Sequence, residues 1–171
     1  MTDLLFRPLH ACFVVALASR RVVHAGVTRH PTDAWLARQL RESTPFGERP
    51  TSLIRDNDSK YGRTFSRVAK ASGITELRTA YRAPQQNAIC EGFLGSVRRE
   101  CLHHVLVLGE ARLRRVLREY AGYLNQHRPH QGRQQQIPDA PAGGTPLPDR
   151  SGRVGATPVL GGRHHAYQRA A

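Results

Sequence analysis

The stretch LIRDNDSKYG, residues 53–62, joins a short apolar run to two aspartates in a strongly basic chain. The segment 51–56 has the composition of a strand, and Asp56 stands at its carboxyl end. Side chains at that end of a strand emerge at the edge of an open α/β sheet where binding sites are usually built. Asp58 lies in the following turn, where an Asx turn accounts for it. The stretch therefore predicts an α/β fold with Asp56 as a candidate site residue.

The charge of the chain indicates a polyanionic partner. Lys and Arg total 26 against 13 Asp and Glu among 171 residues, which gives a net charge of +13 and a pI near 11.1. Nucleic acid is the first candidate partner and an anionic membrane surface the second. Lys60 and Lys70 are the only lysines, and heavy arginine use of this kind can also reflect GC-rich coding.

Cysteine usage and hydropathy predict a cytoplasmic protein that makes no membrane contact. No apolar run approaches the ~18 residues that span a bilayer. Cys12, Cys90 and Cys101 are odd in number and far apart, which argues against a disulfide framework and for a reducing compartment.

Apolar periodicity predicts one mixed α/β domain with helices on the faces of its sheet. A hairpin comes first, then strands alternate with helices, and two amphipathic helices close the domain. The expected strands are 12–18, 21–28, 51–56 and 76–81, and the expected helices are 30–43, 63–74, 90–106 and 109–127. Thr32 is the expected N-cap of the first helix, and Gly73 is expected to close the second. We place the core domain at 1–137 and expect 138–171 to be a basic, Pro/Gly-rich tail, extended or disordered.

Glu91 stands one residue into the helix expected from Cys90 and follows a Pro/Gln/Asn loop. An acid there is stabilised by the helix N-terminus by about 0.3–1 kcal/mol, which needs no further function. A joint metal site with Asp56 is the second interpretation, and the spacing alone leaves both open.

Several motifs together resemble the catalytic core of insertion-sequence transposases of the retroviral-integrase type. They are Asp-x-x-x-x-Tyr at 56–61 after a strand, Pro-x-x-Asn-x-x-x-Glu at 84–91 opening a helix, then SVRREC (96–101) and YLNQHRPH (123–130). The resemblance covers residues 6–137, and GRVGATPVLGGRHHAY (152–167) is also similar to tails in this family. Their order and spacing, more than any single motif, carry the match.

The resemblance implies an RNase H-like mixed sheet flanked by helices and a DDE carboxylate triad that binds two Mg²⁺ (or Mn²⁺) ions. The second family acid corresponds to Asp56 and the third to Glu91, with 34 residues between them. Such ions activate the attacking oxygen and stabilise the leaving oxygen in phosphodiester transfer. The implied function is DNA integration and recombination by strand transfer. The implied partners are transposon ends and target DNA, held by two or more copies of the protein.

Four further residues are expected at the DNA by this resemblance. Arg98 and Arg99 follow Glu91 on the same predicted helix, and each is either a DNA contact or a solvated charge. Asn87 is either a helix cap or a DNA contact. Arg128, after the last helix, is structural or faces DNA.

The first acid of the family triad has no clear counterpart. In the family an Asp-containing strand precedes the segment that matches from Phe6, and only MTDLL stands there. Asp3 is the only acid available upstream of the hairpin, at the position of the turn after the first strand, so it is a weak candidate for the third ligand. We therefore predict that the central first strand is missing and that the chain is a truncated transposase, inactive as given. The alternative is a non-catalytic DNA-binding remnant.

Overall fold

The computed structural model describes residues 1–44, 50–79, 84–139 and 153–169, with the side chains of 84–87, 133 and 169 left aside. The strands are β1 His10–Val15, β2 Val22–Thr28, β3 Ser52–Arg55, β4 Thr75–Arg78, β5 Val154–Val159 and β6 His164–Arg169. The α-helices are α1 Asp33–Ser43, α2 Arg63–Ala71, α3 Pro84–Ser96 and α4 Glu110–Gln126. A π-helical segment, Val97–Cys101, and 3₁₀ turns at Leu102–His104 and Gln131–Arg133 complete the elements. No described helix is long and apolar enough to cross a membrane.

Three two-stranded sheets are present among the described residues. β1 pairs antiparallel with β2, and β3 pairs parallel with β4 across α2. The sequence predicts one mixed sheet. In the structure β1 pairs only with β2, and β3 only with β4, because no described strand lies between β1 and β3 to join the two pairs. The predicted absence of the family's first strand stays a prediction.

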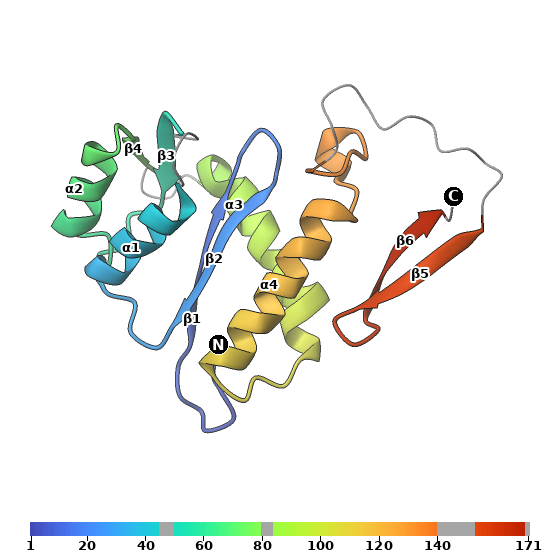
Figure 1. Ribbon diagram of the computed structural model, residues 1–171. Coiled ribbons are helices and arrows are strands. Elements are labelled where there is room, and N and C mark those ends of the chain that lie inside the picture. Colours follow the sequence, from blue (N-terminus) through green and yellow to red (C-terminus); the bar gives the residue numbers. More distant parts are fainter. Residues whose placement is uncertain (45–49, 80–83, 140–152, 170–171) are drawn as a thin grey trace.

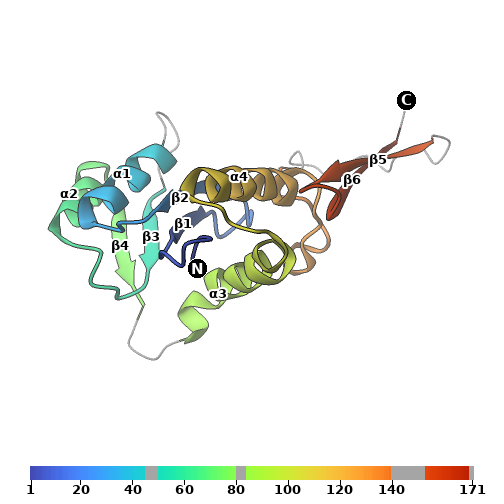
Figure 2. The same ribbon diagram turned by 90° about the horizontal axis from the view of Figure 1, so that it is seen from below.

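The β1–β2 hairpin lies between helices. Figure 2 shows α1 and α4 on one side of it and α3 on the other. Phe13 of β1 meets Phe93 of α3 edge to face at 5.1 Å between ring centroids. The buried side chain of Asn125 in α4 accepts from the Val22 amide at 2.8 Å and donates to the Val22 carbonyl at 3.0 Å. These contacts fasten α4 to the start of β2.

Two apolar cores follow from this arrangement. The first lies between the hairpin, the π-helical segment and α4 and includes Val27, Val97 and Tyr120. The second lies between α1 and α2 and includes Leu40, Phe65 and Val68. Figure 1 shows α1, α2, β3 and β4 together at one end of the molecule.

The ends of α1 and α2 confirm the sequence-based predictions. The Thr32 side chain accepts from the Trp35 amide at 3.2 Å, so it is the N-cap of α1. Gly73 has φ +71°, the left-handed conformation that glycine adopts after a helix. At Gly26 of β2, an added Cβ would stand 1.9 Å from Gln39 Oε1 of α1. Glycine therefore allows α1 to pack directly on the hairpin.

Two regions differ from the sequence-based predictions. The helix expected at 90–106 begins at Pro84, changes to π-helical winding at Val97 and ends as a 3₁₀ turn at His104. The range expected to be an extended or disordered tail contains the antiparallel β5–β6 hairpin. This hairpin is held at its turn, where the Leu160 amide donates to Glu119 Oε1 at 2.6 Å, and by the ring of His164, which stacks on Tyr123 at 4.7 Å.

Candidate functional site

Asp56 follows the last residue of β3 and is exposed. Beneath it lies Arg55, a buried arginine with 5% relative exposure. The Arg55 guanidinium donates to Glu76 at 2.8 Å and to the Asp56 carbonyl at 3.0 Å, and it stands 4.7 Å from the centroid of the Tyr61 ring. Arg55 therefore fixes the backbone from which Asp56 projects. Sequence reasoning missed it, because an arginine at the end of a strand ordinarily points to solvent.

The turn after Asp56 is organised by Asp58. Asp58 accepts from the Lys60 amide at 2.9 Å and pairs with the Lys60 ammonium at 2.7 Å. The hydrogen bond from Lys60 lowers the pKa of Asp58. The predicted Asx turn is confirmed. Within the described residues, the carboxylate of Asp56 accepts one hydrogen bond, from the Asp58 amide at 3.3 Å.

Glu91 lies on the exposed side of α3 and has no hydrogen bond or ion pair within the described part of the chain. Its neighbour Cys90 is half-buried. Burial raises the pKa of the Cys90 thiol, and the negative charge of Asp56 raises it further, with a smaller contribution from Glu91. Both carboxylates therefore act on one side chain, although they come from separate elements. A raised pKa also keeps Cys90 protonated at neutral pH, which does not suit a nucleophile.

The charge of Asp56 also acts on a second thiol. Burial raises the pKa of Cys12, on β1, to about 11, and the charge of Asp56 adds to this shift. The charge of Asp56 therefore acts on thiols of both β1 and α3.

Asp3 lies apart in a turn at the start of the hairpin and is almost fully buried. Its carboxylate accepts from the Leu5 and Arg7 amides, each at 2.9 Å, and from the Arg29 guanidinium at 2.7 Å. Desolvation opposes ionisation, but the hydrogen bonds from Arg29 and the two amides outweigh it and lower the pKa of Asp3. All these contacts fit a residue that orders the turn.

The expected DNA-contacting residues are in different surroundings. Arg98 and Arg99 are exposed on the π-helical segment. Arg128 donates to Glu100 at 2.5 Å, and Glu100 also accepts from the Tyr120 hydroxyl at 2.9 Å. Arg128 therefore joins the end of α4 to the π-helical segment. The side chain of Asn87 lies outside the described residues.

The acids of the described chain divide into two groups. Nine of them pair with a cation or accept from backbone amides of another segment. These are Asp3, Asp33, Glu42, Asp58, Glu76, Glu100, Glu110, Glu119 and Asp139. Within the described residues, Asp56 and Glu91 have neither kind of partner. Carboxylate oxygens of this kind are what Mg²⁺ and Mn²⁺ prefer. Within the described ranges, no three His, Cys, Asp or Glu residues gather to hold a metal ion.

Comparisons with known proteins agree with this fold. The cryoEM structure of the simian T-cell lymphotropic virus intasome in complex with PP2A regulatory subunit B56 gamma contains a similar chain, with a TM-score of 0.58 at 14% identity. The similarity covers 95% of this chain and 60% of that one. At this identity it shows the fold alone, which is the RNase H-like α/β fold.

Sequence comparisons narrow the class. Residues 72–138 match the family model of the integrase core domain. A 39.2 kDa uncharacterized protein of insertion element IS476 from Xanthomonas euvesicatoria is 30% identical over 125 residues, which are 72% of this chain and 36% of that protein. These comparisons support an integrase-core protein related to insertion-element proteins, and the chain spans about a third of this relative.

Proposed function

We propose that the chain carries part of the active site for strand transfer on DNA, with Asp56 and Glu91 as ligands of a divalent cation, Mg²⁺ or Mn²⁺. The observation that supports this is the division of the acids. In a chain with a net charge of +13, these two carboxylates have no cationic partner in the described ranges, although they are exposed. Carboxylates without a cation of the chain beside them remain available to a bound divalent cation, which prefers oxygen ligands.

The role of each residue follows from its position. A bound divalent cation would polarise a phosphodiester and lower the pKa of the attacking water or hydroxyl. Arg55 holds the carbonyl of Asp56 and thereby positions its carboxylate. The exposed Arg98 and Arg99 would bind the phosphate backbone of DNA. By family resemblance, two or more copies would hold the two transposon ends.

Metal binding tests the two ligands directly. We expect heat of Mn²⁺ binding in isothermal titration calorimetry of the whole chain, lost in Asp56→Asn and in Glu91→Gln. Glu110→Gln is the matched control, because Glu110 is paired with Arg114 on the side of α4. Equal Mn²⁺ binding by all four proteins would contradict the assignment.

Cleavage tests the reaction. Because the chain is predicted to lack the first acid of the triad, it should nick DNA fragments from either side of the gene with Mg²⁺ or Mn²⁺ only if Asp56 and Glu91 suffice for the reaction. Asp56→Asn should abolish any such nicking. Activity that is lost in Asp3→Asn while the fold is retained would instead make Asp3 a ligand and contradict the predicted truncation.

A non-catalytic DNA-binding function is the second candidate. It is favoured because the described residues offer two carboxylates and no group of three potential ligands. Such a protein would bind duplex DNA with an affinity that falls steeply with salt, because bound cations are displaced from the phosphates. DNA binding of this kind without metal-dependent nicking would select this candidate.

A further inference from the structure

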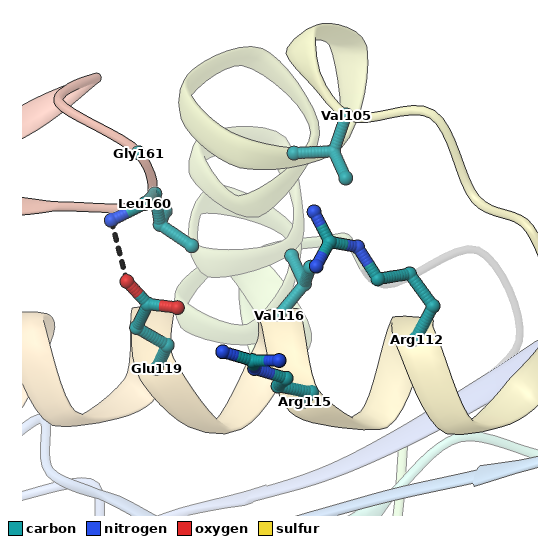
Figure 3. Close-up of a pocket in the computed structure, with 7 residues that line it drawn as sticks. All are labelled: Val105, Arg112, Arg115, Val116, Glu119, Leu160 and Gly161. Atoms are coloured by element: carbon teal, nitrogen blue, oxygen red, sulfur yellow. Dashed lines mark hydrogen bonds between the residues drawn. The ribbon is translucent and has the colours of Figure 1, made fainter.

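A groove lined by neither Asp56 nor Glu91 is formed by three segments. They are the loop after the 3₁₀ turn Leu102–His104, α4 and the turn between β5 and β6. It consists of two hollows with cavity volumes of about 290 and 410 Å³, which share Val105, Arg112 and Leu160. Figure 3 shows the first hollow, with the side chains of Arg112, Arg115 and Val116 rising from α4 toward Val105 and Leu160.

The wall of the second hollow is apolar and open to solvent. Leu106 and Leu108 line it and are 67% and 59% exposed, whereas Val107 between them is buried in the core. This alternation presents both leucines outward. Leaving such side chains in water forgoes about 25 cal/mol for each Å² of apolar surface that could be buried, and exposed apolar surface of this kind marks interaction sites.

The cations of the groove are not neutralised within the described chain. Arg112 and Arg115 have no ion pair or hydrogen bond there, in contrast to Arg114 on the same helix, which pairs with Glu110. Glu119 is the acid that lines the groove, and one of its oxygens accepts from the Leu160 amide. The groove thus combines open leucines with two uncompensated arginines.

We propose that this groove binds an acidic segment of another polypeptide, with an aliphatic side chain against Leu106 and Leu108 and carboxylates on Arg112 and Arg115. Charge complementarity selects this occupant. A second copy bound through the same face would bring the arginines of both copies together, which is repulsive for an isologous contact. DNA would satisfy the arginines but would leave the leucines without an apolar partner, because phosphate contacts are polar.

Three synthetic peptides test the proposal by fluorescence anisotropy with the whole chain. The first has Leu at helical spacing and Glu elsewhere, the second replaces Glu by Lys, and the third replaces Leu by Ser. We expect binding of the Glu/Leu peptide and at least about tenfold weaker binding of the other two, which is the loss expected for one removed charge or apolar anchor. No binding of the Glu/Leu peptide, or equal binding of the Lys/Leu peptide, would overturn the proposal.

Variants locate the binding site. Arg112→Glu and Leu108→Asp should each weaken the Glu/Leu peptide about tenfold or more. Arg118→Glu, an equal charge change at an exposed position of α4 outside the groove lining, should change it less than about twofold. Circular dichroism checks that each variant is folded. An equal loss of peptide affinity in Arg118→Glu would show that binding depends on the net charge of the protein and not on the groove.

The other possible occupants give distinct results. If the groove served DNA, Arg112→Glu would weaken binding of a DNA duplex more than Arg118→Glu does. If it served a second copy, Leu108→Asp would convert a dimer to a monomer in analytical ultracentrifugation. Either result, without a specific effect on the peptide, would overturn the proposal, and none of these measurements depends on metal binding by Asp56 or Glu91.

Discussion

The α1–α2 unit and α3 each carry an acid on a helix, but they use it in opposite ways. Asp33, in the first turn of α1, accepts from the amides of Gly62, Thr64 and Phe65 at 2.8–3.1 Å and so caps α2 across the core. Glu91, in α3, contacts no cation or amide in the described chain. One acid is engaged by the fold, and the other has no partner within the described chain.

The difference extends to packing. Phe65 of α2 is buried in the second core, 3% exposed, and meets Tyr61 edge to face. On α3, Phe93 is only half-buried, and Ile89 and Leu94 are more than a third exposed. The α1–α2 unit beside β3 is therefore more closely packed than α3, the helix that carries Glu91.

The largest expected effect of a substitution is at Phe65. Phe65→Ala should lower the free energy of unfolding by about 3–5 kcal/mol, because it leaves a cavity in a closed core. Phe93→Ala should lower it by about 1–2 kcal/mol, since that ring is half in water and loses mainly its contact with Phe13. Urea unfolding followed by circular dichroism measures both. Equal losses would show that α3 is packed as firmly as α2.

The next largest loss of stability is expected when Asp33, the cap of α2, is replaced. Asp33→Ala should lower the free energy of unfolding by about 1–2 kcal/mol, because three amides at the start of α2 lose their acceptor. Asp33→Asn retains one acceptor oxygen and should cost less. A loss below that of Glu42→Ala, an acid paired with Arg38 at the surface, would contradict the importance of this cap.

The cap also predicts a pH dependence. Desolvation opposes ionisation of Asp33, but the amide hydrogen bonds from Phe65, Thr64 and Gly62 outweigh it and lower its pKa below 3.8. A carboxyl whose pKa is lower in the folded state stabilises the fold above its unfolded pKa, and this contribution is lost as the pH falls through the folded pKa. Urea midpoints measured from about pH 6 down to about pH 3 should therefore fall less in Asp33→Asn than in the original chain.

The smallest effect on stability is expected for the two acids without an ion pair in the described chain, Asp56 and Glu91. Asp56→Asn and Glu91→Gln should change the free energy of unfolding by less than about 0.5 kcal/mol, as surface substitutions do. Removal of a like charge would even favour the fold if the two carboxylates repel each other. A loss above about 1 kcal/mol at either position would mean that the acid has a structural partner.

Local signals predicted much of this fold. Thr32, Gly73 and the apolar spacing of 110–126 each identify an element from a few neighbouring residues, and the acid at the end of β3 follows from its strand. The cap made by Asp33 could not be found this way, because the amides that it binds are about 30 residues away in the chain. The burial of Arg55 is likewise set by Glu76, on the neighbouring strand.

The β5–β6 hairpin does have a local sequence signal, but the composition of the surrounding segment favoured a tail. Gly161 and Gly162 have positive φ and form the turn of β5–β6, and a glycine pair between two short β-type segments is a recognised hairpin signal. The basic, Pro/Gly-rich composition of 138–171 argued instead for a tail. The hairpin is stable because it rests on Tyr123 and Glu119 of α4, contacts that its own composition does not reveal.

The burial of the cysteines has a practical consequence for measuring distances in this protein. The pKa values of Cys12 and Cys101 are raised to about 11, chiefly by burial, and that of Cys90 is raised in the same way. Maleimides react with thiolates, which these residues rarely form at neutral pH. An Arg118→Cys variant would therefore accept a spectroscopic label ahead of the native thiols. Such a label on α4 would report on the approach of a labelled peptide or DNA without prior removal of any native cysteine.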